Sequence, residues 1–220
     1  IKGNYQEYDL IKCLIDSKEI YRLDILEKSL NQSQKILGIS KKEFCNKFGF
    51  TKSLLNEDPE TIHDILAESL FVLDLNQNHF YDIQKLPNSI KIDKDKIPIA
   101  DFIATFKKDK YAIEIKTIRI GNITPETNDN LSADLKKEYW WGKMFLNNAI
   151  TKIERKEKKL IKQLCNTHKY YSCDKRMLVL YVRRLGPSTL MTKIDYHNEF
   201  KILREKYSMI DCFSVKNYFG

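Results

Sequence analysis

Glycine, proline and long apolar runs are scarce in this sequence. Its 220 residues include 7 Gly and 5 Pro, and no long low-complexity segment occurs. The apolar runs are short and interrupted by charges, so we expect no membrane-spanning helix, and no stretch resembles a secretory signal. With 42% hydrophobic residues, the chain can bury one sizeable core and support a small appended subdomain. It begins at Ile1 rather than Met, which leaves open a residue or segment ahead of it.

Cysteine is present without a disulfide pattern. The 5 Cys are odd in number and scattered, which favours reduced thiols and a cytoplasmic location, in a prokaryotic cytosol or nucleoid. Cys165, His168 and Cys173 are close enough in sequence to suggest zinc ligands. Their spacing is irregular and a clear fourth ligand is lacking, so a zinc site is not expected.

Acidic residues are outnumbered by basic ones. The chain has 38 Lys and Arg against 30 Asp and Glu, which gives a net charge of +8. A basic excess favours a polyanionic partner, and nucleic acid is the commonest one. The alternative is that the frequent Lys, Asn and Ile reflect the base composition of the source genome. Charge therefore supports a nucleic-acid partner without deciding for it.

The first 56 residues are expected to form a helical subdomain, because apolar residues recur there at helical spacing. The segment from Ser40 to Leu55 predicts two short helices joined near Gly49, with Ser40 and Thr51 as N-caps. This pair resembles the helix-turn-helix of DNA-binding proteins. An ordinary helical hairpin has the same spacing and remains the alternative.

Residues 57–220 are expected to form a second domain. Asp58 and Pro59 mark the start of its first helix, since Pro is favoured in a first helical turn. The elements predicted along this domain are a helix over 60–75, a strand or loop near 80–83, strands over 97–106 and over 110–118, a long helix over 135–164, a strand over 177–182, a helix over 196–207 and a strand over 210–215. Their order indicates an α/β (α+β) fold with a mixed central sheet flanked by helices.

Two acids and a lysine occupy the strands over 97–106 and 110–118, which we expect to form a hairpin. Asp101 lies within an apolar run, where an acid loses hydration unless a partner compensates. Glu114 and Lys116 share one face of the next strand, since side chains alternate with period two. Pairing would bring Asp101 beside Glu114, and a divalent cation would relieve the repulsion between the carboxylates. Oxygen ligands suit Mg²⁺. The alternatives for Asp101 are a buried salt bridge and a position at the end of a strand.

An Asp in one strand followed by Glu-x-Lys in the next resembles the PD-(D/E)xK nuclease superfamily, which includes restriction endonucleases and Holliday-junction resolvases. The resemblance covers about Glu60 to Val182 and implies a restriction endonuclease-like core. It implies that Asp101, Glu114 and the backbone carbonyl of Ile115 bind Mg²⁺, for which Mn²⁺ can substitute. It also implies that Lys116 orients or deprotonates the attacking water.

Two further positions bear on this resemblance. Glu68, on the helix before the sheet, is similar to an additional catalytic acid that many members place near the metal, and an ordinary surface glutamate is the alternative. Ala100 stands where the name of the motif has Pro. The long helix has no clear match to the glutamine-and-tyrosine motif of the RecB-like branch, so the subfamily stays open.

The resemblance implies a metal-dependent DNA endonuclease in restriction, phage defence or repair. The alternative is a non-catalytic DNA-binding or assembly module on the same fold. Cutting both strands would favour a homodimer, and RNA as substrate stays open. Basic residues expected to contact phosphates lie on the long helix and at the end of the Glu-x-Lys strand: Lys143, Lys152, Arg155, Lys156, Lys159 and Arg119. An ordinary solvated helix face is the alternative for each of them.

Overall fold

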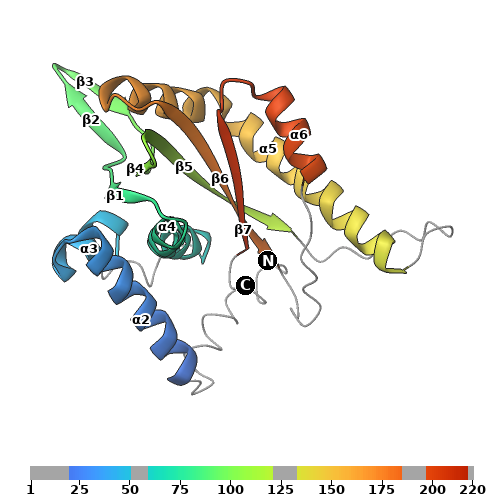
Figure 1. Ribbon diagram of the computed structural model, residues 1–220, viewed down its shortest axis with the longest axis horizontal. Coiled ribbons are helices and arrows are strands. Elements are labelled where there is room, and N and C mark those ends of the chain that lie inside the picture. The colour runs from blue at the N-terminus through green and yellow to red at the C-terminus, as the bar shows by residue number, and fades with distance from the viewer. Residues whose placement is uncertain (1–19, 51–58, 121–132, 185–196, 218–220) are drawn as a thin grey trace. The chain divides into compact units, whose positions relative to one another are not determined.

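The computed structural model describes residues 20–50, 59–120, 133–184 and 197–217 (Figure 1). The helices are α2 (Ile20–Leu37), α3 (Lys41–Phe48), α4 (Pro59–Gln77), α5 (Ala133–Tyr170) and α6 (His197–Lys206). The strands are β1 (Tyr81–Lys85), β2 (Ser89–Ile92), β3 (Asp95–Pro98), β4 (Phe102–Phe106), β5 (Asp109–Ile120), β6 (Lys175–Arg184) and β7 (Cys212–Asn217).

These elements form a mixed α/β protein, as expected from the order of helices and strands. One sheet has five strands in the order β1-β4-β5-β6-β7, and β2 and β3 form a separate antiparallel pair. The larger sheet is mixed, because β1 pairs with β4 antiparallel whereas β6 pairs in parallel with both β5 and β7. None of the described helices combines the length and the apolar character needed to cross a bilayer.

Two compact units divide the chain. The first comprises Ile1–Pro87 and Phe102–Lys108, and the second comprises Asn88–Asp101 and Asp109–Gly220. The expected helical subdomain over 1–56 falls within the first unit, which also contains α4, β1 and β4. The expected domain boundary after residue 56 therefore stays a prediction.

The first unit confirms the predicted helix start at Ser40. The Ser40 hydroxyl oxygen accepts a hydrogen bond from the Glu43 N–H at 3.2 Å, which satisfies one of the free donors of the first turn of α3. Gly49 ends this helix with φ 79°, a left-handed conformation that glycine adopts without strain. The second predicted helix, which would begin at Thr51, lies outside the described residues, so the helix-turn-helix stays a prediction.

Aromatic side chains form much of the core of the first unit. The rings of Phe48 and Phe71 each have their centroid 6.1 Å from that of Phe102. All three side chains are almost completely buried. They join α3 and α4 to β4, and α4 begins at Pro59, as the preference of Pro for a first turn predicted.

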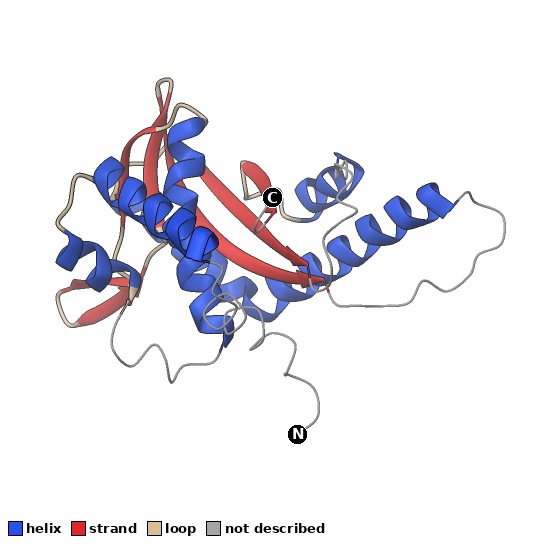
Figure 2. Cartoon of the chain, turned by 90° about the horizontal axis from the view of Figure 1, so that it is seen from below, coloured by secondary structure: helices blue, strands red, loops and turns tan. Residues whose placement is uncertain are grey.

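The second unit contains the long helix and the parallel strands. Helix α5 spans 38 residues, more than the predicted range over 135–164, and it lies against β5 and β6 (Figure 2). Helix α6 contacts both α5 and β7. The stripe of α5 that faces the strands includes Ile153, Leu160 and Leu164, all buried, as the helical spacing predicted. The β2–β3 hairpin was not predicted from the sequence.

Candidate metal centre

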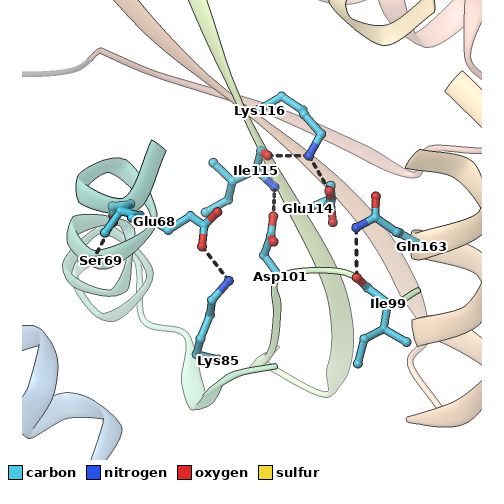
Figure 3. Close-up of polar contacts among 10 residues, drawn as sticks. Glu68, Ser69, Lys85, Ile99, Asp101, Glu114, Ile115, Lys116 and Gln163 are labelled. Carbon is cyan, nitrogen blue, oxygen red and sulfur yellow. Dashed lines mark hydrogen bonds and ion pairs between the residues drawn. The ribbon is translucent and has the colours of Figure 1, made fainter. Parts of the chain in front are cut away.

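Asp101 lies in a bend between β3 and β4, one residue before β4 begins. The prediction of a single strand over 97–106 is therefore wrong. The strand is interrupted after Pro98, where the Ile99 carbonyl and the Ala100 N–H bond to side chains of α5. The carboxylate of Asp101 nevertheless reaches β5, where its Oδ2 accepts a hydrogen bond from the Ile115 N–H at 2.8 Å (Figure 3).

Glu114 and Lys116 lie on one face of β5, as strand periodicity predicted. The ammonium of Lys116 donates to Oε1 of Glu114 and, at 3.0 Å, to the backbone carbonyl oxygen of Ile115. The Glu114 side chain is 1% exposed and that of Lys116 is 16% exposed. A buried carboxylate is costly unless a positive charge accompanies it, so this ion pair is a condition for burying Glu114.

The ammonium of Lys116 contacts oxygen atoms of the expected metal site. Glu114 Oε1 and the Ile115 carbonyl oxygen are two of the three oxygens that the resemblance assigns to the metal, and both bind the same positive group. The third oxygen belongs to Asp101, which bonds to the N–H of Ile115. The structure therefore brings Asp101, Glu114, Ile115 and Lys116 together. Carboxylate and carbonyl oxygens are the ligands that Mg²⁺ prefers, so the donor set fits this ion.

The donor set contains only two acidic side chains. Among the described residues, no group of three or more His, Cys, Asp or Glu side chains could hold a metal ion. The expected set does not require one, because its third donor is a main-chain carbonyl. Metal binding by Asp101, Glu114 and Ile115 stays a prediction.

Glu68 belongs to the first unit, where it pairs with a lysine. Its Oε2 is 2.6 Å from Nζ of Lys85, whose side chain is only 3% exposed (Figure 3). The same ammonium lies 4.9 Å from the centroid of the Phe102 ring. Glu68 thus has a structural role as counter-ion of a buried lysine. Lys85 was not among the residues predicted from the sequence, although strand alternation places it on the same buried face as Ile83.

Three polar residues of α5 bind the segment that precedes Asp101, and they too were not predicted from the sequence. Gln163, Asn166 and Thr167 bond to the backbone of Ile99, Pro98 and Ala100, respectively. Their only signal in the sequence is that polar residues interrupt the apolar stripe of a long helix. That signal did not reveal what they bind, because the partner segment lies more than sixty residues earlier.

The described basic residues of α5 are distributed around the helix, but four of them share one face. Helical geometry places Lys152, Arg155, Lys159 and Lys162 on one face, which we call the basic stripe. The last three are exposed and Lys152 is half-buried. Lys143 is also exposed but lies nine residues before Lys152, about 180° around the helix.

Three other charged residues are not part of the basic stripe. Lys156 is exposed beside the basic stripe, and the side chain of Arg119 lies outside the described residues. Glu154 points elsewhere, because its Oε1 is 2.6 Å from Nζ of Lys206 on α6. The basic stripe is therefore not neutralised by Glu154.

Comparison of the chain with protein-family models, curated proteins and solved structures gave no significant match. A functional proposal therefore depends on the residues and contacts of this chain.

Proposed function

We propose that this protein is a Mg²⁺-dependent endodeoxyribonuclease with a restriction endonuclease-like core, acting in restriction, phage defence or repair. The observation that supports the proposal most directly is the pair of contacts made by Lys116. Its ammonium binds Glu114 and the carbonyl of Ile115, and the N–H of Ile115 binds Asp101. The backbone N–H and carbonyl groups of one residue of β5, Ile115, thus link the two acids and the lysine that the motif requires.

The residues of the centre have separate roles in this proposal. Asp101, Glu114 and the Ile115 carbonyl would hold the cation, which when bound would supply charge stabilisation at the phosphate and a bound water of lowered pKa. When the cation binds, the Lys116 ammonium would move away from Glu114 Oε1 and the Ile115 carbonyl oxygen, to which it now donates. Its ammonium would then be available to orient the attacking water and to offset negative charge that develops on the phosphate.

The basic stripe of α5 supports DNA as the substrate. Lys152, Arg155, Lys159 and Lys162 repeat along one helix face, and the chain has a net charge of +8. Regularly spaced basic side chains suit the phosphates of a duplex, which attract them regardless of base sequence. The stripe would supply affinity for DNA of any sequence.

Cleavage of supercoiled plasmid with and without Mg²⁺ tests the proposal, and Asp101→Asn is the informative variant. An asparagine oxygen can still accept the Ile115 N–H, so the change removes the charge while it preserves the hydrogen bond. We expect at least a hundredfold loss of cleavage with DNA affinity unchanged. If the wild type cleaved neither duplex, junction nor single-stranded DNA, with Mg²⁺ or Mn²⁺, the proposed nuclease activity would be refuted. That result would favour a non-catalytic DNA-binding module.

A matched control lies at the other end of β5. Oδ2 of Asp174 accepts the N–H of Lys110 at 2.8 Å, the same kind of contact and the same distance as in the Asp101–Ile115 pair. Asp174 is exposed and has no place in the proposed centre. Asp174→Asn should therefore cut DNA at the wild-type rate. Equal losses in both variants would show that Asp101 acts only through the fold.

A further inference from the structure

Three neighbouring side chains of α5 hold the backbone directly before Asp101. Gln163 Nε2 donates to the Ile99 carbonyl at 3.1 Å (Figure 3). Asn166 Nδ2 donates to the Pro98 carbonyl at 2.8 Å. Oγ1 of Thr167 accepts the N–H of Ala100 at 2.7 Å. Three successive residues are thus fixed by one turn of helix, because positions i, i+3 and i+4 share a helix face.

Most of these contacts lie in the interior. Thr167, Ile99 and Ala100 are completely buried, and Gln163 is 8% exposed. The Thr167 hydroxyl makes two bonds, since it also donates to the carbonyl oxygen of Gln163 at 2.8 Å. A buried polar group that loses its partner is strongly disfavoured, so the segment has little freedom to shift relative to α5.

The β2–β3 hairpin restrains the beginning of this segment, because Pro98 pairs with Ser89 and the Ile99 N–H donates to the Asn88 carbonyl oxygen at 3.4 Å. Residues 99 and 100 belong to no strand, and Asp101 follows them immediately. Ala100 has a main-chain N–H that a proline would lack, and its φ is not fixed by a ring. Thr167 satisfies that N–H and restrains the residue next to Asp101.

We propose that Thr167, supported by Gln163 and Asn166, is the positioning residue for the carboxylate of Asp101. Its effect on metal binding rests on the proposed nuclease function, whereas its effect on the geometry of Asp101 does not. Thr167 touches neither metal nor DNA in this proposal. It fixes the backbone from which the Asp101 side chain reaches the N–H of Ile115.

Thr167→Val tests the proposal, because valine keeps the shape of threonine and lacks its oxygen. Hydrogen exchange of the Ile115 N–H, followed by NMR, reports whether Asp101 still occupies its place. We expect this amide to exchange at least tenfold faster in Thr167→Val while the amides of β6 and β7 are unchanged. Mn²⁺ affinity and the single-turnover cleavage rate should each fall about tenfold to a hundredfold, as for residues that orient metal ligands.

Two further variants separate positioning from general stability. Thr167→Ser keeps the oxygen and should restore Ile115 protection and Mn²⁺ affinity to within about threefold of the wild type. Ser69→Ala removes a buried hydroxyl that, like Thr167, donates to the carbonyl four residues earlier, here that of Ile65 at 2.7 Å. It should lower the melting temperature without altering the exchange of Ile115. Asn166→Ala, at a half-buried site, replaces Thr167→Val if the latter does not fold.

The outcomes distinguish this inference from the nuclease proposal. Equal Ile115 protection in the wild type and in Thr167→Val would overturn the positioning role, whether or not the protein cuts DNA. Failure of Thr167→Ser to restore protection would also overturn it. A wild type that neither binds Mn²⁺ nor cuts DNA would refute the nuclease alone, because the exchange of Ile115 would still decide the role of Thr167.

Discussion

The Asp101 carboxylate accepts the backbone N–H of Ile115 at 2.8 Å, and thereby joins the bend before β4 to the middle of β5. The carbonyl of the same Ile115 accepts the ammonium of Lys116. Strand β5 pairs in parallel with β6 along its length, so the backbone of Ile115 is a rigid reference point. Sites built on such strands hold their geometry better than sites on loops.

Lys116→Met should strengthen metal binding while it slows cleavage. The ammonium of Lys116 occupies two oxygens of the proposed metal site, so its removal eliminates a competing cation. We expect Mn²⁺ affinity to rise by about tenfold, which corresponds to about 1.4 kcal/mol. The single-turnover rate should fall by about 10²–10⁴-fold, the usual contribution of a general acid or base. Titration of free Mn²⁺ by electron paramagnetic resonance and quenched-flow cleavage measure the two effects.

The same variant should depend on metal for its stability. Without a cation, Lys116→Met leaves Glu114 buried without the lysine, a change that costs about 3–5 kcal/mol when one partner of a buried pair is removed. Mg²⁺ should restore most of this loss. Lys110→Met is the control, since Lys110 lies on the same strand and its ammonium donates to the Tyr171 carbonyl, at 2.9 Å. Weaker Mn²⁺ binding by Lys116→Met would contradict the competition.

The basic stripe predicts how the affinity for DNA depends on salt concentration. Each phosphate contact that is lost lowers the slope of log affinity against log salt by about one. Lys159→Gln and Arg155→Gln should therefore each reduce the slope for duplex DNA by about one, whatever its sequence. Lys143→Gln, on the opposite face of α5, should have a smaller effect. Fluorescence anisotropy at several salt concentrations measures the slopes.

A lysine on another helix supplies the control for this series. Lys201 is exposed on α6 and carries the same charge as Lys159. Lys201→Gln changes the net charge equally but removes no residue of the stripe. If it lowered the salt slope as much as Lys159→Gln, the stripe would have no special part in binding.

Much of the second unit could be predicted from local sequence. The alternation around Glu114 and Lys116 predicted β5 and the face that the two share, and the apolar spacing along α5 predicted its buried stripe. The break at 99–101 could not be predicted, because backbone groups at and before it bond to Gln163, Asn166 and Thr167 in a distant helix. In the sequence these residues cannot be distinguished from polar residues of a solvated helix.

The β2–β3 hairpin was missed for a local reason. Its two strands have only four residues each, and half of the residues in β3 are charged. Neither strand is long enough to show alternation against the frequent lysines of this chain. Asp93, in the turn between them, has φ 54°, a left-handed conformation that Asp adopts more readily than most residues. That preference alone does not identify a hairpin.

Glu68→Gln should destabilise the protein through Lys85. The variant leaves a lysine ammonium buried without its carboxylate, which costs about 3–5 kcal/mol. Glu68→Gln combined with Lys85→Met removes both charges and should recover most of this loss. Urea denaturation of the single and double variants measures the coupling. Additive losses would show that the pair contributes nothing.

Cleavage by the double variant then tests the additional role expected of Glu68. Since the stability loss is largely corrected, a cleavage rate near that of the wild type would assign Glu68 to structure alone. A rate reduced by a hundredfold or more would show that the carboxylate also serves the chemistry.

Asp211 should make stability sensitive to acid. Burial by itself raises the pKa of this carboxyl, but hydrogen bonds from the side chain and backbone of Arg176 outweigh burial and hold the pKa below its usual value. Oδ2 of Asp211 accepts Arg176 N at 2.8 Å and Nε at 3.0 Å. Because the folded-state pKa is lowered, the stabilisation is fully present above the unfolded-state pKa and is lost as the pH falls through the folded-state value.

Asp211→Asn isolates this contribution. Asparagine can still accept both hydrogen bonds but has no charge, so we expect a loss of about 1 kcal/mol at neutral pH, typical of a partly exposed charged pair. The difference from the wild type should be constant between about pH 5 and 7 and should shrink below about pH 4, where the wild-type carboxylate begins to protonate. Urea denaturation of both proteins at pH 7, 5 and 3 measures it. A difference that grew on acidification would require the pKa of Asp211 to be raised, and would contradict the role of Arg176.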